Sequence, residues 1–101
     1  MAALGILEVF WLTTALVAAD AACKAGKVTI QSFDKNKPAN ADNLLVPLLV
    51  VIKLRGSVSD VEMAMEAGIK AANSISGVSC SYIIPNPDEG IKLFIHESCI
   101  K

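Results

Sequence analysis

The feature that most constrains the fold is a strand-like apolar run that leads into an alanine-rich helical run, a plan that the chain shows twice. The first copy extends from Ala3 to Val28 and reads ALGILEVFWLTTALVAADAACKAGKV. The second enters its helix in RGSVSDVEMAMEAG, from Arg55 to Gly68. Short apolar runs that alternate with helical periodicity predict strands alternating with helices. The chain is therefore expected to fold as a duplicated β–α unit.

The first half of the chain predicts a strand, a helix and a second strand. Residues 3–9 form the first strand, and Thr13 or Thr14 caps the helix that follows. Gly26 ends this helix, and residues 27–33 alternate apolar and polar side chains as a half-buried strand does. The apolar stripe expected to face the core of this helix consists of Leu12, Ala15, Leu16, Ala19 and Cys23.

The second half repeats the plan. Residues 44–54 are almost continuously apolar, and Pro47 predicts that this strand starts after it or lies at an edge there. Ser57 and Asp60 have the spacing of a helix start, and residues 78–84 form the last strand. The stripe expected to be buried on the second helix consists of Val58, Val61, Met65, Ala72 and Ile75.

The order of these elements is β-α-β-β-α-β, the split βαβ arrangement of the α+β class. It predicts a four-stranded antiparallel sheet with two helices on one face. Residues 91–99 add a short C-terminal helix. We expect one domain over residues 1–101, with a core at 3–87 and a C-terminal segment at 88–101.

The composition favours self-association. Apolar residues make up 53% of the chain and charged residues 19%, so a small domain cannot hide all its apolar surface alone. The net charge of −1 provides no basic field for nucleic acid or acidic lipid. The apolar N-terminus is not expected to be an export signal or a membrane span, since no Lys or Arg precedes it and Glu8 interrupts it.

Neither metal-binding nor catalytic patterns are found in the sequence. Cys23, Cys80 and Cys99 do not have the spacing of zinc ligands, and Cys23 and Cys80 are expected to be buried thiols in a reduced compartment. The only histidine, His96, lies far in sequence from any plausible nucleophile, and no phosphate-binding glycine loop is found. We expect a chain that is not an enzyme and that needs no cofactor.

Several of these segments resemble the bacterial microcompartment shell proteins. Members of that family open with A-L-G-x-I-E, continue into a helix ending x-x-A-D-x-x-x-K-A, and later carry R-G-D-V-x-x-V-x-x-A-x-x-A-G. The resemblance extends from about Ala3 to Pro87. It implies a cytoplasmic shell component that forms flat cyclic hexamers, tiles into facets with other shell proteins around encapsulated enzymes, and passes small metabolites through a central pore.

The resemblance also implies site residues. The loop between the second and third strands lines the pore in this family, and here it is expected at residues 34–43. A lysine near the end of the first helix lies at the hexamer edge, and Lys24 occupies that place. The pore candidates are Asp34, Lys35, Asn36, Lys37, Pro38, Ala39 and Asn40, and the further edge candidates are Pro85, Asn86 and Pro87.

The chain departs from the family pattern in three places. The edge element I-P-R-P reads Ile84-Pro85-Asn86-Pro87 here, and Trp11 or a neighbour replaces a glycine before the first helix. The pore loop is longer and contains no glycine, which is an unusual feature shared with the branch associated with glycyl-radical enzymes. That branch can hold an iron–sulfur cluster through a loop cysteine, which is absent here, so no cluster is predicted.

Other interpretations of the same residues stay open at this point. Lys24 could be a solvated lysine paired with Asp20, and the 34–43 loop could be a surface loop without a conducting role. The alternative function is a small cytosolic metabolite-binding or regulatory domain of split βαβ type, in which that loop contacts the ligand. Fold alone does not decide between these functions.

Overall fold

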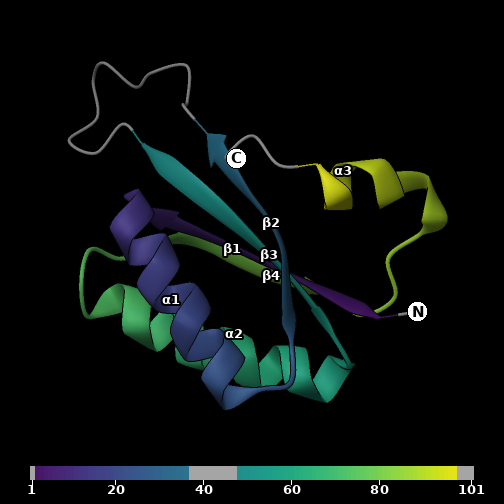
Figure 1. Cartoon of the computed structure of the whole chain (residues 1–101), viewed down its shortest axis with the longest axis horizontal. Helices are drawn as coiled ribbons and strands as arrows, with labels where there is room; N and C mark the ends of the chain where they lie inside the picture. Colours follow the sequence, from purple (N-terminus) through teal and green to yellow (C-terminus); the bar gives the residue numbers. More distant parts are fainter. Residues whose placement is uncertain (1, 37–47, 98–101) are drawn as a thin grey trace.

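The computed structural model describes residues 2–36 and 48–97 and confirms the predicted order of elements. Its strands form one antiparallel sheet in the order β2-β3-β1-β4 (Figure 1). The elements are β1 (Ala3–Phe10), α1 (Leu12–Ala25), β2 (Thr29–Asn36), β3 (Leu49–Gly56), α2 (Val58–Asn73), β4 (Val78–Ile84), the 3-10 turn η2 (Glu89–Ile91) and α3 (Lys92–His96).

Helices α1 and α2 lie side by side on one face of the sheet (Figure 1). Leu7 of β1 and Ile52 of β3 are directly paired, so both side chains point to the same face, and both are fully buried beneath the helices. Burial of each such side chain contributes about 1.5–3 kcal/mol to folding. This apolar layer is the core that the two predicted helices were expected to cover.

The buried stripe of α1 differs from the prediction. The helix buries Thr14 and four alanines (Ala15, Ala18, Ala19 and Ala22), whereas Leu12, Leu16 and Cys23 are exposed. Small side chains let α1 approach α2 closely: a Cβ added to Gly68 of α2 would lie 3.3 Å from the Ala18 carbonyl oxygen. Hydropathy alone predicts that the leucines are buried. The short distance between the two helices instead leaves room only for small side chains, so the alanines are buried.

The start of α1 is also not capped as predicted. Its N-cap residue is Trp11, and no side chain accepts a hydrogen bond there. Thr14 lies within the helix, where its Oγ1 is 2.7 Å from the Oγ of Ser76. A hydroxyl that is buried in this way needs a partner, and the turn after α2 provides it.

Helix α2 starts as predicted. The Oγ of Ser57 accepts a hydrogen bond from the Asp60 amide at 3.2 Å, and the Ser57 hydroxyl donates to the Asp60 carboxylate at 2.8 Å. The bond from the Ser57 hydroxyl lowers the pKa of the Asp60 carboxyl, and a bond from the Lys27 amide lowers it further. Val61, Met65 and Ala72 are buried as predicted, whereas Val58 and Ile75 are exposed.

The sheet explains the position of Pro47. Strand β3 starts at Leu49 and is hydrogen-bonded to β1 on one side and β2 on the other. A proline within such a central strand would remove a ladder bond, so the strand begins after it, as predicted. Strand β2 extends to Asn36, three residues beyond its predicted end at Phe33.

The opposite face of the sheet carries α3 (Figure 1). The Ser32 hydroxyl donates to the Ile95 carbonyl at 3.0 Å, and Lys53 Nζ donates to the carbonyls of Phe94 at 2.6 Å and Glu97 at 3.1 Å. Since a helix ends with unpaired carbonyls, Lys53 acts as a side-chain cap for α3. Helix α3 confirms the prediction of a short C-terminal helix, and it spans five residues.

Candidate functional site

The cross-strand pairs define two opposite ends of the molecule. At one end, which we call the loop end, Leu49 pairs with both Phe10 and Asn36. The Trp11 amide donates to the Leu48 carbonyl there at 3.2 Å, so α1 begins at this end. At the other end, which we call the Lys24 end, Arg55 pairs with Leu4 and with Thr29.

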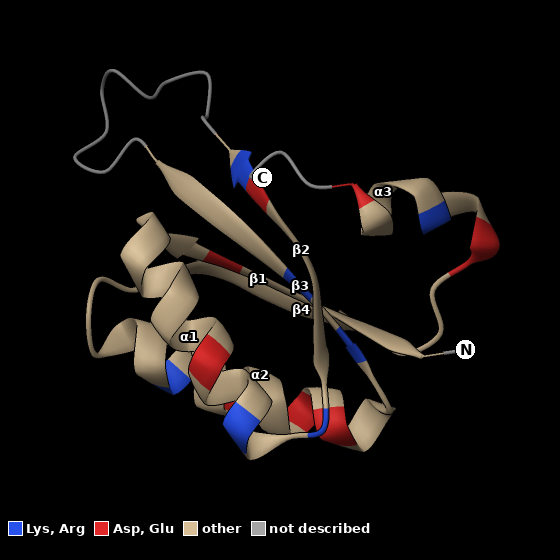
Figure 2. Ribbon diagram, viewed as in Figure 1, with Lys and Arg blue, Asp and Glu red and all other residues tan. Residues whose placement is uncertain are grey.

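The pore candidates that the structure describes lie at the loop end, but not in a loop. Asp34, Lys35 and Asn36 are the last residues of β2, which corrects the predicted start of the loop. Lys35 is exposed, and Asn36 Nδ2 donates to Glu8 Oε2 at 3.1 Å. Figure 2 shows adjacent basic and acidic segments near the end of β2. Lys37, Pro38, Ala39 and Asn40 lie outside the described residues.

Asp34 forms an ion pair with Lys53 on the α3 face of the sheet. The two side chains are only 20% and 13% exposed. This carboxylate therefore neutralises the ammonium that caps α3, and it is not a free charge at the loop end. Nothing in the spacing of the two residues predicts the pair, because Asp34 and Lys53 are 19 positions apart in the sequence and only the pairing of β2 with β3 brings them together.

The edge candidates lie at the same end of the sheet, the Lys24 end. Lys24 Nζ is 2.7 Å from Asp20 Oδ2, and both side chains are well exposed. The hydrogen bond and charge of Asp20 raise the pKa of Lys24 above its usual value. Pro85 and Asn86 follow the end of β4 and are exposed, whereas Pro87 is buried.

A close backbone contact holds the Lys24 end together. Gly26 ends α1, as predicted, and a Cβ at this position would lie 2.3 Å from the carbonyl oxygen of Asp60. The φ of Gly26 is −137°, which any residue adopts, so the close approach and not the conformation requires glycine. The Lys27 amide also donates to Asp60 Oδ1 at 3.2 Å.

Trp11 has an unusual backbone conformation at the loop end. Its φ of 74° and ψ of 147° lie in a region that is essentially restricted to glycine. Of the predicted alternatives, Trp11 is therefore the residue that takes the place of the glycine. The junction is fixed on both sides: the Ser76 hydroxyl donates to the Phe10 carbonyl at 2.8 Å, and the Ala15 amide donates to the Trp11 carbonyl at 3.2 Å.

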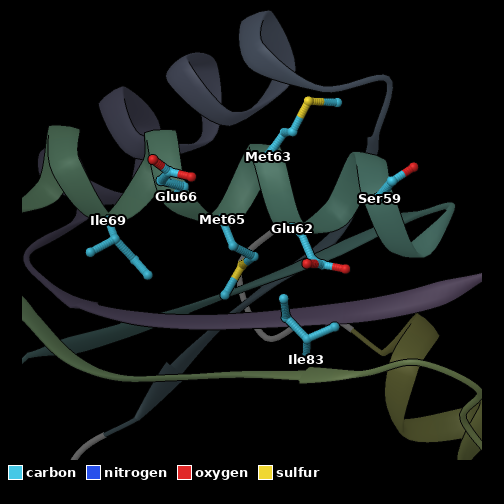
Figure 3. A pocket seen from close by; sticks show the side chains of 7 residues that line it. All are labelled: Ser59, Glu62, Met63, Met65, Glu66, Ile69 and Ile83. Atoms are coloured by element: carbon cyan, nitrogen blue, oxygen red, sulfur yellow. The ribbon is translucent and has the colours of Figure 1, made fainter.

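A groove of about 670 Å³ runs between α2 and β4 (Figure 3). The side chains of Met65, Ile69 and Ile83 meet in the space between the helix and the strand, whereas Met63 points away from β4. Glu62 and Glu66 of α2 also line the groove. The sequence pattern alone does not predict this groove, although Glu62 and Glu66 repeat at a helical spacing next to Met63 and Met65.

Two cysteine predictions are wrong. Cys23 and Cys80 are exposed free thiols, because Cys23 lies on the outward side of α1 and Cys80 on the edge strand β4. The Glu8 carboxylate is 3.6 Å from Cys80 Sγ. Partial desolvation and this charge raise the pKa of the Cys80 thiol. Cys99 lies outside the described residues.

The part of the chain that the structure describes contains no cluster of metal-ligating side chains. Among residues 2–36 and 48–97, no three His, Cys, Asp or Glu side chains are grouped so that they could hold a metal ion. His96 is exposed at the end of α3. In the same ranges, no helix has the length and hydropathy needed to cross a bilayer.

Comparison with known proteins gives a consistent result. Residues 3–87 match the family model described as the BMC domain. A carboxysome shell protein, CcmK3 of Halothece sp., is 38% identical over 92 residues, which cover 89% of this chain and 81% of that protein. The bacterial microcompartment shell protein PduA of Citrobacter freundii is 32% identical over 90 residues, covering 89% and 87%.

A solved structure has the same fold. The crystal structure of a microcompartments protein from Desulfitobacterium hafniense DCB superimposes with a TM-score of 0.72 at 23% identity. The match covers 100% of this chain but spans only 50% of that longer chain. The arrangement of sheet and helices described above is therefore shared with a microcompartment protein.

Proposed function

Since this chain belongs to the BMC domain family, we propose that it is a structural shell protein of a bacterial microcompartment and assembles as a cyclic hexamer. It is not an enzyme. Its place is in a microcompartment within the cytoplasm, where it joins other shell proteins around encapsulated enzymes. The single observation that carries this proposal is the family match over residues 3–87, with shell-protein relatives above 30% identity over most of the chain.

The two ends of the molecule take different roles in this proposal. The loop end, with Lys35 and Asn36 at the end of β2, faces the symmetry axis and leads into the pore-lining residues 37–40. The Lys24 end, with Lys24 and the Pro85–Pro87 element, faces outward to the neighbouring hexamer. Support comes from the placement of the two sets at opposite ends of the sheet, as a ring with a central pore and an outer edge requires.

The charge of the pore follows from this arrangement. Asp34 is neutralised by Lys53, so it does not add a free carboxylate at the axis. Lys35 is exposed at the end of β2, and Lys37 follows it along the chain. A ring of these lysines would attract anionic metabolites. The glycyl-radical-associated branch stays a prediction, since the relatives reported above carry carboxysome and Pdu names.

Sedimentation velocity on the purified chain tests the assembly. A hexamer that persists on dilution is the expected result, and negative-stain microscopy should show rings with a central depression. A monomer at high protein concentration would contradict the proposal. The alternative of a metabolite-binding regulatory domain would instead require a stoichiometric, saturable metabolite affinity in a chain that does not assemble.

A further inference from the structure

A cavity of about 230 Å³ lies between α3 and the sheet, on the face opposite α1 and α2 (Figure 1). Two cross-strand pairs form its floor: Leu4 of β1 pairs with Ile84 of β4, and Ile6 of β1 pairs with Lys53 of β3. Side chains alternate along a strand, and Leu7 is buried beneath α1 and α2. Leu4 and Ile6 therefore point to the α3 face, into the cavity.

The roof of the cavity comes from η2 and α3. It consists of Ile91, Phe94 and Ile95, whose spacing of three and four residues places them on one side of a helical segment. Ile95 is buried, whereas Phe94 is 68% exposed although it lines the cavity. An apolar molecule bound beside Phe94 would remove part of this ring from water, which is favourable.

The one charged residue of the lining, Lys53, has no free hydrogen-bond donor for a ligand. An ammonium group carries three protons. Three acceptors take them: the carbonyls of Phe94 and Glu97 and the carboxylate of Asp34. The apolar stem of Lys53 is then what remains for the cavity wall. Since the other six lining residues are apolar, a charged or strongly polar ligand would lose its hydration without compensation.

The attachment of α3 keeps the cavity from closing. Ser32 of β2 and Lys53 of β3 hold the helix through its carbonyl groups. The cavity floor, in contrast, is formed largely by β1 and β4. A movement of α3 toward Ile84 would therefore strain or break bonds on the other side of the helix, and each is worth about 0.5–1.5 kcal/mol.

The size of the cavity limits what can occupy it. A dry cavity of about 150 Å³ lined by Leu, Ile and Phe binds benzene. The cavity under α3 has the same kind of lining and is somewhat larger. A peptide would bring backbone N–H and C=O groups that need partners, and this lining does not provide them. A small molecule without polar groups therefore fits better than a polypeptide segment.

We propose that the cavity between α3 and the sheet is a binding site for one small, uncharged apolar molecule of about the size of benzene or toluene. Its lining residues all belong to one copy of the chain, so the site is complete without a neighbour. The inference therefore does not rest on the proposed hexamer. The site consists of Leu4, Ile6, Lys53, Ile84, Ile91, Phe94 and Ile95.

Titration of the full-length protein with toluene tests the site. Selective labelling of the isoleucine δ1 methyl groups lets NMR follow each part of the fold. Saturable shifts are expected for the isoleucines that line the cavity, which are Ile6, Ile84, Ile91 and Ile95. Ile52 lies beneath α1 and α2, and Ile69 lies in the groove between α2 and β4, so both should stay unchanged.

A matched pair of substitutions tests whether toluene occupies this space. Ile6→Phe fills the cavity from its floor and should weaken toluene binding by about tenfold or more. Ile75→Phe makes the same chemical change at a position that is 50% exposed and outside the cavity, and it should bind toluene as the parent does. Circular dichroism of both variants shows whether the fold is kept.

Benzoate provides a test on the unmodified chain. It has the same ring as toluene but carries a charge, so it should give no saturable shifts. Tighter binding of benzoate than of toluene would show that Lys53 is open to anions, and this would overturn the proposal. Toluene shifts confined to Ile69, or no saturation at any isoleucine, would also overturn it. Such results with an intact hexamer leave the proposed shell function standing, and a monomeric chain that binds toluene here refutes only the assembly.

Discussion

At the scale of single residues, Trp11 holds a backbone conformation in which a side chain is costly. Its φ and ψ of 74° and 147° lie where strain of about 1–3 kcal/mol is typical. The surrounding hydrogen bonds from Ser76 and to Leu48 hold the junction in place. The positive φ at Trp11 therefore carries a conformational cost that glycine would not have.

A comparison of two truncations measures that strain. Trp11→Gly and Trp11→Ala both remove the indole, but only glycine adopts this conformation freely. We expect Trp11→Gly to be more stable than Trp11→Ala by about 1–2 kcal/mol, the reverse of the usual ranking. Urea denaturation followed by circular dichroism would show it. Equal midpoints for the two variants would mean that the junction relaxes.

The Cys80 thiol gives a second prediction at this scale. Its raised pKa lowers the fraction of reactive thiolate at neutral pH, so alkylation should be slow until the pH rises. Glu8→Gln removes the neighbouring charge, lowers the thiol pKa and should speed alkylation of Cys80 several-fold at pH 8. Mass spectrometry with iodoacetamide would follow each thiol, and Cys23 should react at an unchanged rate. An unaltered Cys80 rate would contradict the assigned cause.

At the scale of elements, α3 depends on a side chain from β3. A helix of five residues is too short to be stable by itself, and Lys53 caps its carbonyls while Asp34 neutralises the lysine. Ile95 is buried against the sheet and adds the apolar part of the contact. The position of the C-terminal segment is therefore set by strand pairing.

Loss of this cap should release α3. Lys53→Met leaves the α3 carbonyls without their donor and Asp34 without its cation, at a cost of about 2 kcal/mol. Limited chymotrypsin digestion should then cut the segment after Pro87 faster, at Leu93 or Phe94, with the core intact. Lys92→Met, at an exposed position on α3 itself, is the control and should change little. Equal protection of the segment in both variants would show that Ile95 packing alone holds the helix.

At the scale of the whole molecule, charges and exposed apolar residues are divided among separate surfaces. Lys24 and Asp20 lie on the outward end of α1, and the apolar Leu12 and Leu16 lie toward its start. Such a division suits a tile that makes one kind of contact within a ring and another between rings. If the Lys24 end is the hexamer edge, as proposed, Asn86 stands where the resemblance implies an edge arginine, and Lys24 is expected to be the main cation there.

Reversal of the Lys24 charge should affect the contacts between rings and leave the contacts within a ring intact. Lys24→Asp removes an exposed ammonium whose apolar stem can lie along a partner, so the ring should persist while extended sheets are lost. Electron microscopy of the assembled protein would show whether extended sheets form, and sedimentation velocity on the same sample would show whether the ring persists. Sheets that are unchanged in the variant would refute the edge role, and loss of the ring itself would place Lys24 in a different contact.

The sequence by itself determined the order of elements, the turn residues and the family. Local chemistry decides these: Ser57 caps α2 through an amide three residues away, Gly26 ends α1, and Pro47 precedes β3. Strand and helix periods are equally local, so the split βαβ order followed from them. The shell-protein motifs are runs of neighbouring residues, so the family was predicted from them too.

Only the tertiary structure decided which side chains are buried and which charges are free. Hydropathy placed Leu16 and Cys23 in the core, but the close approach of α1 to α2 leaves room only for alanine, so both are exposed. Asp34 was predicted to line a pore, but antiparallel pairing brings it to Lys53 and neutralises it. Burial and ion pairing depend on residues far apart in the chain, and the periodicity of one segment contains no information about its partner in space.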